Sequence, residues 1–388
     1  MEERDVAVVG AGPYGLAVAA ACAAAGRSAV VFGPPMETWR QMPAEMELRA
    51  AWREMALTRA GAPGSLEEWC ESTGVTPHEP MTVTEFIAYA TWFAERYVTD
   101  CVHAMVTSIE RGEDGSFFVH AGGDWRVSEV VVAPGIGPFP HVPEVFADAI
   151  EDARIGFAAG SDPADGEGLR VAVIGAGQSA VEAAAAAVRS GAETTLVARS
   201  TVHWFADHEP SHPRGPLQRR LFELAYPAVG YGPPPLNRLV LHPDLFARLP
   251  IALRRRLTGR LLRPGASPWL REGVVGKATI EEGVEVTAVS CPERSVLLTL
   301  SDGRTLELER ILLGTGYRFN LERLEFLSPA LRGHIRVANG WPVLDRAFRS
   351  TEPHLRFVGY PAEGRFGPIA RFVLGVPFTS SRVAATLG

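Results

Sequence analysis

Residues 6–32 read VAVVGAGPYGLAVAAACAAAGRSAVVF, and this stretch decides the fold. A short β-branched run, Val6 to Val9, enters the glycine-rich segment, and an alanine-rich run from Leu16 to Ala25 follows it. A second β-branched run, Ala29 to Phe32, comes after Gly26. This order predicts a strand, a tight turn, a helix and a second strand, which is the βαβ unit of a parallel sheet.

The same pattern recurs at residues 171–198, which read VAVIGAGQSAVEAAAAAVRSGAETTLVA. Each copy is followed later by an apolar run that ends in a glycine turn, VVVAPG at 130–135 and ILLGTG at 311–316. The repetition predicts an α/β fold with two Rossmann-like dinucleotide-binding domains, the second inserted into the first.

Composition shifts along the chain suggest where the domains divide. We expect the first domain to cover residues 1–160, with a helical insertion at about 45–100, and to resume at 315–388. The second domain is expected at 168–314, with an insertion at about 200–275. Insertions of this kind commonly carry a substrate pocket.

The helical insertion contains two sequence signatures of a helix start. Ser65 with Glu68 and Thr82 with Glu85 have the spacing of capping boxes, in which each side chain bonds the other residue's backbone. Two capped helices are therefore predicted there.

The two glycine turns have the spacing that dinucleotides require. The first glycine permits the turn, the second lets a pyrophosphate approach the backbone, and the third position allows close helix packing. Helix N-terminal amides then hold the phosphates. The residues at these positions are Gly10, Gly12 and Gly15 in the first copy, and Gly175, Gly177 and Ala180 in the second.

The residue after the second strand of each unit indicates which ribose is bound. Arg199 stands at that position in the second unit and favours the 2′-phosphate of NADPH, although an exposed arginine at a strand end is also common. In the first unit Gly33 occupies the position where a carboxylate is expected, and Glu37 is the nearest acid after it in sequence.

Composition and charge exclude several classes of protein. With 46% hydrophobic and 21% charged residues the chain is neither disordered nor fibrous, and its net charge of −7 argues against a nucleic-acid partner. The four cysteines form no CxxC pair, which fits a reducing cytoplasm and argues against a dithiol centre. The acidic start and the glycine-broken apolar run after it indicate neither export nor a transmembrane segment.

These motifs resemble the two-dinucleotide-binding-domain flavoproteins, and among them the single-component flavin-dependent monooxygenases. The likeness rests on GAGPYG, METWR at 36–40, VVVAPG, VAVIGAGQSA, GTGY at 314–317 and FVGY followed by FGPIARFVLG. The resemblance implies contacts to FAD from Gly10, Gly12, Pro13, Tyr14, Gly15, Trp39, Arg40, Val106, Gly135, Gly316, Tyr317, Gly359, Phe366 and Gly367. It implies contacts to NADPH from Gly175, Gly177, Gln178, Ser179, Ala180 and Arg199. A packed aromatic without direct function is an equal alternative for Tyr317.

Departures from the family pattern bear on the reaction. The Baeyer–Villiger motif FxGxxxHxxxW is absent, because the stretch beginning at Phe146 has neither the histidine nor the tryptophan. The asparagine that flavin-containing monooxygenases place after their GLWR-like segment is also absent from LRAAWREM at 48–55. An amine nitrogen or another soft nucleophile is therefore favoured over a ketone as the site of oxygenation.

The leading hypothesis is an FAD-dependent, NADPH-consuming monooxygenase that uses molecular oxygen on a small organic molecule. One alternative is an oxidoreductase that transfers hydride without inserting oxygen, and another is a non-catalytic nucleotide-binding redox sensor. No residue is assigned as a catalytic acid or base.

Two further segments have compositions that could form a site. A metal is not expected among His203, Asp207, His208, Glu209 and His212, because prolines interrupt the run and the spacing fits no zinc pattern; a pocket-shaping loop that includes Trp204 or a plain surface loop fits better. The basic segment 248–263 places Leu253, Leu257 and Leu261 on one predicted helix face. It suits a membrane surface, an acidic carrier protein or, more commonly, a solvated face over a local core. Homodimer formation stays undetermined.

Overall fold

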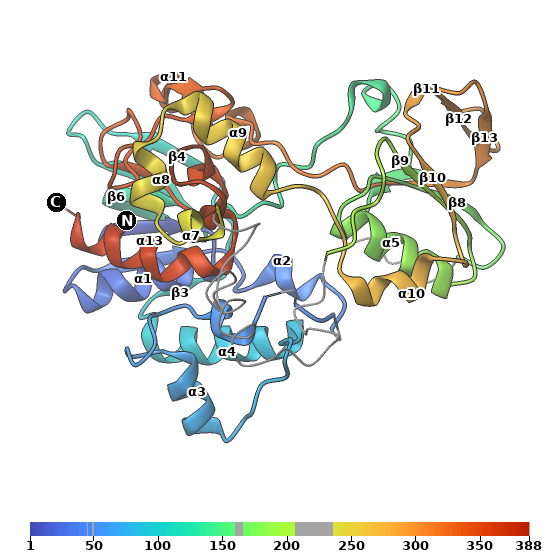
Figure 1. The fold of residues 1–388 in the computed structure, drawn as a ribbon. Coiled ribbons are helices and arrows are strands. Elements are labelled where there is room, and N and C mark those ends of the chain that lie inside the picture. Colours follow the sequence, from blue (N-terminus) through green and yellow to red (C-terminus); the bar gives the residue numbers. More distant parts are fainter. Residues whose placement is uncertain (45, 49, 160–165, 206–235, 388) are drawn as a thin grey trace. The chain divides into compact units, whose positions relative to one another are not determined.

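The computed structural model describes residues 1–44, 46–48, 50–159, 166–205 and 236–387. The chain forms two compact units (Figure 1). The first unit comprises Met1–Phe139, Gln218–Leu262 and Phe319–Gly388, and the second comprises Pro140–Leu217 and Arg263–Arg318. None of the described helices is long and apolar enough to cross a membrane.

A parallel sheet forms the centre of the first unit. Its order is β3-β2-β1-β6, and β17 pairs with the last half of β6, which gives the five-strand order of a Rossmann domain. The strands are β1 (Glu2–Val9), β2 (Ala29–Phe32), β3 (Cys101–Val102), β6 (Asp124–Val132) and β17 (Leu355–Phe357). Strand β1 begins earlier than Val6 because Glu2 to Arg4 pair with the start of β6.

An antiparallel extension continues this sheet. The first half of β6 pairs with β5 (Phe117–His120), which pairs with β4 (Ser108–Arg111). A pair of antiparallel strands therefore precedes β6, whose end carries the VVVAPG turn.

Helices cover the parallel sheet of the first unit. Helix α1 (Pro13–Ala24) follows the first glycine turn, and α13 (Val376–Ala385) lies beside it (Figure 1). The remaining elements of this unit are α2 (Glu37–Arg40), η1 (Trp52–Met55), α3 (Leu66–Thr73), α4 (Val83–Tyr97), α7 (Leu236–Val240), α8 (Pro243–Arg248), α9 (Ile251–Leu261), η4 (Leu321–Arg323), α11 (Pro329–His334), β15 (Val337–Ala338), β16 (Trp341–Pro342), η5 (Tyr360–Ala362), α12 (Glu363–Phe366), η6 (Pro368–Arg371) and η7 (Val373–Gly375).

One of the two predicted capping boxes forms completely. At the start of α4, Thr82 and Glu85 exchange side-chain and backbone hydrogen bonds in both directions. At the start of α3, the Ser65 hydroxyl accepts from the Glu68 amide, but the Glu68 carboxylate accepts from the Gly64 amide at 2.7 Å instead. The second box is therefore only half formed, because the carboxylate bonds the residue before the cap.

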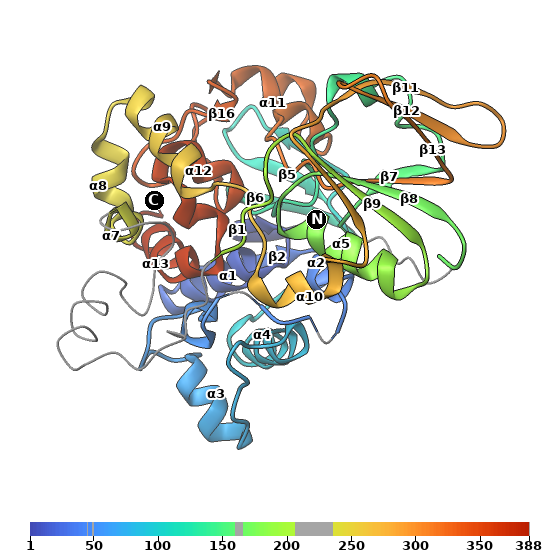
Figure 2. The same cartoon turned by 45° about the vertical axis from the view of Figure 1, so that its right-hand side comes forward.

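The second unit has a five-stranded parallel sheet in the order β10-β9-β8-β14-β7. Its two layers of cover are visible in Figure 2, with α5 and α10 on one side and β11, β12 and β13 on the other. The elements are η2 (Glu144–Phe146), β7 (Ile155–Phe157), β8 (Arg170–Ile174), α5 (Gln178–Arg189), β9 (Glu193–Ala198), η3 (Pro268–Leu270), α10 (Arg271–Val274), β10 (Thr279–Glu282), β11 (Val286–Ser290), β12 (Val296–Leu300), β13 (Thr305–Leu308) and β14 (Arg310–Leu313).

The sequence of β8 explains this double cover. Val171 and Val173 pack into the core on the α5 side, whereas Ala172 and Ile174 pack into the core under the hairpin strands. A strand buried on both faces needs apolar residues at every position, as parallel strands do. A hairpin turn at Gly303, with φ of +87°, joins β12 to β13.

The compact units differ in extent from the ranges expected from sequence. Residues 236–262 belong to the first unit, although the sequence placed them in an insertion of the second domain. The reason is packing, because Phe246, Leu257 and Leu261 share a core with Ile369. The boundary also falls after Phe139 and not at residue 160, because β7 joins the second sheet beside β14.

The face predicted for the basic helix is wrong at one position. Leu257 and Leu261 of α9 are buried, but Leu253 is 40% exposed. Arg254 faces inward in its place and donates to the carbonyl oxygens of Gly364 and Arg365. Residues 254, 257 and 261 are spaced three and four apart, which keeps them on one buried face of a helix. Residues at a strict spacing of four, such as 253, 257 and 261, turn gradually away from that face.

Candidate functional site

The first glycine turn joins β1 to α1 at the carboxyl edge of the first sheet. Gly10 has φ of +106°, and a Cβ there would overlap the carbonyl oxygen of Ala133 after β6. A Cβ on Gly15 would overlap the carbonyl oxygen of Gly10. These two glycines are required by the protein's own backbone, so they fix the turn and not its ligand.

Gly12 differs from both neighbours. Apart from its chain neighbours, no described residue has an atom within 4 Å of the position that its Cβ would take, and its φ of −82° is accessible to any residue. Gly12 caps α1, with Pro13 at the first helical position and no side-chain cap. The open space in front of these helix amides is the arrangement that binds a phosphate.

Other predicted FAD contacts gather at the same edge of the sheet. Gly135 lies just beyond β6 and Gly359 just beyond β17, and Gly33, which was not among the predicted contacts, lies just beyond β2. Because all three strands run parallel to β1, their carboxyl ends share one edge, where Rossmann domains bind ligands. Gly135 has φ of +69° and open space around it. Val106, which precedes β4, is 9% exposed.

Tyr14 has a structural role at this turn. Its hydroxyl donates toward the carbonyl oxygens of Phe372 (2.8 Å) and Ile369 (3.2 Å). Burial raises the pKa of this hydroxyl well above its usual value. A Cβ on Gly359 would lie 3.3 Å from the Tyr14 ring, so this side chain locks the C-terminal segment to the turn.

Trp39 and Arg40 lie on α2 near the insertion helices. The Trp39 ring meets Phe86 of α4 edge-on, with centroids 4.7 Å apart. Arg40 is exposed and donates to the Pro35 carbonyl at 3.1 Å and to Thr91 at 3.2 Å. Both side chains hold α2 against α4, and their predicted cofactor contact stays a prediction.

Phe366 and Gly367 are explained by packing. The Phe366 side chain is 1% exposed, and its ring centroid lies 4.3 Å from that of Phe348, so it has little surface left for a cofactor. Gly367 has φ of +80°, and a Cβ there would lie 2.7 Å from the Phe246 ring. Both residues therefore have a role in the aromatic core, and the cofactor contacts that the sequence resemblance implies for them stay a prediction.

The second glycine turn repeats this geometry in the second unit. Gly175 has φ of +142°, and a Cβ there would overlap the carbonyl oxygen of Gly314 after β14. Gly177 is again open, with the nearest atom, on Pro264, 3.9 Å from its Cβ position. Its φ of −95° suits any residue. Ala180 is fully buried, and Gly314 gives it room.

Gln178 and Ser179 open helix α5. The Gln178 amide nitrogen donates to Glu182 at 2.7 Å, and its oxygen accepts from the Ser267 amide at 2.9 Å and hydroxyl at 3.1 Å. Burial raises the pKa of Glu182 to about 7, while the bond from Gln178 lowers it. Gln178 thus positions the helix start, and Ser179 is half-buried next to it.

Arg199 is exposed directly after β9, where the sequence predicted it. Burial, followed by the positive charges of Arg318 and Arg199, lowers the pKa of His141. The His141 amide donates to the carbonyl of Gly316 at 2.9 Å. This edge of the second sheet is therefore positive, as a phosphate site requires. Tyr317 pairs with Pro140 in a β-bridge of the same unit.

The four cysteines are all free, and burial raises the pKa of each. The pKa of Cys22 reaches about 12. Reactive thiols require a lowered pKa, so these residues do not suit disulfide chemistry.

The histidine-rich segment lies mostly outside the described residues. Of its members only His203 is described, and Trp204 beside it packs against the core of the second unit. In the described part of the chain no group of three metal-ligating side chains comes together.

A model of the pyridine nucleotide-disulphide oxidoreductase family matches residues 7–225, more than half of the chain and both glycine turns. The chain belongs to this family. The family assignment agrees with the two open glycine turns.

Curated relatives of this family member are plant enzymes. An indole-3-pyruvate monooxygenase of Oryza sativa subsp. japonica is 28% identical over 338 residues, which cover 81% of this chain and 77% of the relative. Two probable indole-3-pyruvate monooxygenases of Arabidopsis thaliana are 27% and 29% identical. The chain spans only 44% and 45% of their lengths.

Solved structures match this chain along nearly its whole length. Ornithine hydroxylase from Pseudomonas aeruginosa has a TM-score of 0.76 at 18% identity, covering 99% of this chain and 98% of the other. An ornithine N-hydroxylase from Kutzneria sp. 744, solved with reduced FAD, NADP⁺ and L-ornithine, has a TM-score of 0.73 at 18% identity and covers 99% of each chain. These matches confirm the predicted fold of two Rossmann-like domains.

Three residues near the carboxyl edge of the second sheet were not predicted from the sequence. Gly314 lies in a recognised motif, but its contact with Ala180 appears only once β14 is placed beside β8. His141 and Arg318 lie far from Arg199 in sequence and carry no motif. The parallel order of the strands, once predicted, was the available signal, because it puts residues after β9 and β14 at one edge.

Proposed function

We propose that this chain is an FAD-containing, NADPH-consuming monooxygenase that oxygenates a small organic molecule at an amine nitrogen or another soft nucleophile. The observation that carries the proposal is the pair of open positions at Gly12 and Gly177, each in front of unblocked helix amides. The family assignment and the monooxygenases among its relatives support it.

The first unit fits FAD and the second fits NADPH. In the first, Gly10, Gly12 and Gly15 form the turn, and Gly135 and Gly359 line the same sheet edge. In the second, Gly175, Gly177 and Ala180 form the turn, and Arg199 with Arg318 supplies the positive charge for a 2′-phosphate. When bound, NADPH supplies a hydride and the flavin supplies the capacity to activate oxygen.

The chain's own contribution is to bind and orient. No described side chain is assigned as an acid or base, so the expected rate enhancement comes from positioning and from excluding water. One of the structural matches is an N-hydroxylase of ornithine, which supports an amine nitrogen as target.

Hydride transfer without oxygen insertion is the second candidate. The absence of an asparagine in residues 48–55 favours it, since the related oxygenases use that residue. A disulfide substrate is disfavoured by the raised pKa values of all four cysteines.

The deciding experiment uses the purified chain with its flavin, NADPH, ¹⁸O-labelled oxygen and a panel of small amines. We expect a yellow protein, NADPH oxidation matched by oxygen uptake, and a product that carries one labelled atom. NADPH oxidation with an unlabelled reduced product would support the second candidate instead. Colourless protein without NADPH turnover would defeat both and favour the redox sensor.

The unpaired cysteines bear on where the protein works. We place it in the cytoplasm because its four cysteines are free.

A carrier protein or a second copy of the chain would contact the exposed side chains of Ile251 and Leu253, which lie beside the arginines of α9.

A further inference from the structure

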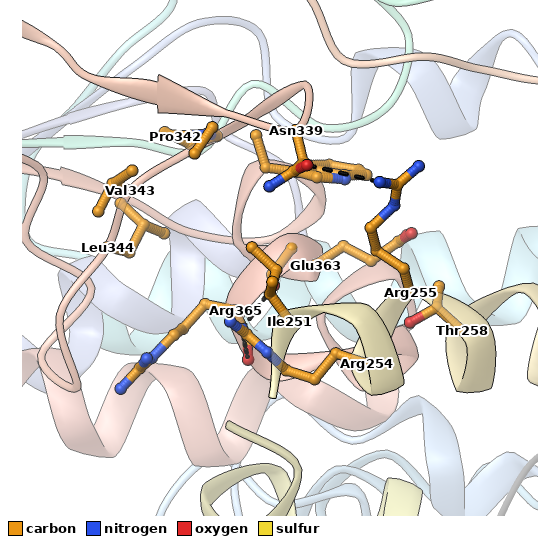
Figure 3. Close-up of a pocket in the computed structure, with 13 residues that line it drawn as sticks. Ile251, Arg254, Arg255, Thr258, Asn339, Pro342, Val343, Leu344, Glu363 and Arg365 are labelled. Carbon is orange, nitrogen blue, oxygen red and sulfur yellow. Dashed lines mark hydrogen bonds between the residues drawn. The ribbon is translucent and has the colours of Figure 1, made fainter. Parts of the chain in front are cut away.

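A cavity of about 290 Å³ lies in the first unit, away from the motifs that define the glycine turns in sequence. Helix α9 forms one wall, and β16 with the start of α12 forms the others (Figure 3). Its volume is at the lower end of the range for small-ligand pockets, so it suits a compact molecule and not a dinucleotide.

Three arginines line this cavity. Arg254 and Arg255 come from α9, and Arg365 comes from α12. Figure 3 shows Arg255 reaching Asn339, with a hydrogen bond of 3.4 Å. Arg254 donates through Nη1 to the carbonyl oxygens of Gly364 at 2.7 Å and Arg365 at 3.0 Å. The three side chains thus line the cavity from two elements that are distant in sequence, and in Figure 3 those of Arg255 and Arg365 extend to opposite sides of the view.

The carboxylate that lines the cavity is already paired. Glu363 is 4% exposed, and its carboxylate accepts from Arg371 at 2.7 Å. Burial raises the pKa of Glu363, against the opposing effect of Arg371. It therefore balances the charge of Arg371 and not that of the three lining arginines.

The lining arginines lack the acid partners that other arginines of the unit have. Arg382 pairs with Asp244, and Arg356 pairs with Glu129. Within the described residues no carboxylate lies at ion-pair distance from Arg254, Arg255 or Arg365. The Nε atoms of Arg254 and Arg365 are buried with no described hydrogen-bond acceptor.

An anion would offset the positive charge that Arg254 and Arg365, both half-buried, place near each other. Burial, and then the like charge of Arg365, lower the pKa of Arg254. A half-buried charge loses part of its hydration, which a bound anion would replace. The chain as a whole has a net charge of −7, so the positive charge of these three arginines is a local feature.

We propose that this cavity binds the carboxylate or phosphate group of a small organic anion through the arginines that line it, Arg254, Arg255 and Arg365. A guanidinium group binds both oxyanions through paired N–H donors, and the Thr258 hydroxyl adds a further donor at the wall. The side chains of Ile251, Val343 and Leu344 provide an apolar wall for the rest of the molecule. The site is distinct from the proposed cofactor turns and does not depend on the proposed reaction.

The test measures binding to the FAD-loaded protein by calorimetry at constant ionic strength. The probes are inorganic phosphate, succinate and the neutral analogue succinamide. We expect phosphate or succinate to bind with a dissociation constant of about 1 mM or tighter, and succinamide to bind at least about tenfold more weakly. Binding of phosphate alone identifies a phosphate group as the ligand, and binding of succinate alone identifies a carboxylate.

Variants locate the binding. Arg365→Gln and Arg255→Gln are each expected to weaken it at least about tenfold, whereas the control Arg256→Gln, an exposed neighbour on α9 that does not line the cavity, leaves it within about twofold. Arg255 is exposed and its described bond is long, so Arg255→Gln keeps the test valid if Arg365→Gln fails to fold. Anion binding no stronger than that of chloride, or equal loss in Arg256→Gln and Arg255→Gln, would overturn the proposal.

Discussion

The Cβ of Ala180 lies 2.5 Å from the position that a Cβ would take on Gly314. The second glycine turn has alanine at its third position, where the first turn has glycine. Strand β14, which lies beside the second turn, is followed by glycine. Helix α5 can therefore approach β14 closely although the third position of the motif has a side chain. Gly314 belongs to the packing of the nucleotide turn as much as the residues of the motif itself.

The first prediction concerns this contact. Gly314→Ala is expected to lower the free energy of unfolding by about 1–3 kcal/mol, because the new methyl overlaps Ala180. Adding Ala180→Gly should restore only part of the loss, since the Ala180 Cα remains 2.7 Å away. Gly156→Ala, in open space on β7, is the matched control. Urea denaturation measures all three, and a Gly314→Ala protein as stable as the control would refute the contact.

A second prediction concerns the buried ion pair of the first unit. Arg356 is fully buried and donates through Nε to Glu129 at 2.8 Å. Arg356→Met leaves the Glu129 carboxylate buried without its guanidinium and should cost about 3–5 kcal/mol of stability. The double variant Arg356→Met with Glu129→Gln should recover much of this in denaturant titrations. If it is no more stable than the single variant, the charge pair is not the cause.

Arg199 tests the choice of nucleotide. Arg199→Ala removes a positive charge from the proposed 2′-phosphate site and should raise KM for NADPH about tenfold, with KM for NADH nearly unchanged. Arg189→Ala, at the far end of α5, should change neither value. Steady-state kinetics with both nucleotides decides, and an equal effect on the two would remove the phosphate role.

Glu182 predicts a pH dependence of stability. Its pKa is raised from 4.5 to about 7 in the folded protein, so the folded state binds the extra proton between these values. Stability attributable to this group is therefore fully present below the unfolded pKa and falls as the pH rises through the folded pKa, by about 3 kcal/mol in total. Glu182→Gln should remove this component. The difference between wild type and variant, measured by unfolding from about pH 5 to 8, should widen with pH; a constant difference would contradict it.

The fold was predictable because short-range sequence patterns indicate both βαβ units. Strand Ala29–Phe32 has the bounds predicted for it, and the turns at Gly10 and Gly175 lie where their motifs indicate. The candidate edge residues follow from the parallel strand order, which places Gly135 and Gly359 next to the first turn.

Long-range packing accounts for what the sequence could not predict. Arg254 takes the inward place expected for Leu253 because its partners, the carbonyls of Gly364 and Arg365, come from a segment 110 and 111 residues later. The contact of Phe366 with Phe348 in the aromatic core was likewise not predicted from the sequence. Neither contact leaves a local signal in the chain.

The most direct test of the two-nucleotide account uses Gly12→Ala and Gly177→Ala. Both positions have ordinary φ values, and among the described residues an added Cβ would meet nothing closer than the ordinary contact of Gly177 with Pro264 at 3.9 Å, so the apoproteins should melt like wild type. Only a bound phosphate would meet the added methyl groups. We expect purified Gly12→Ala to lose most of its FAD, and Gly177→Ala to keep its FAD but show a KM for NADPH raised about tenfold or more. Full FAD content in Gly12→Ala together with an unchanged KM in Gly177→Ala would contradict the account.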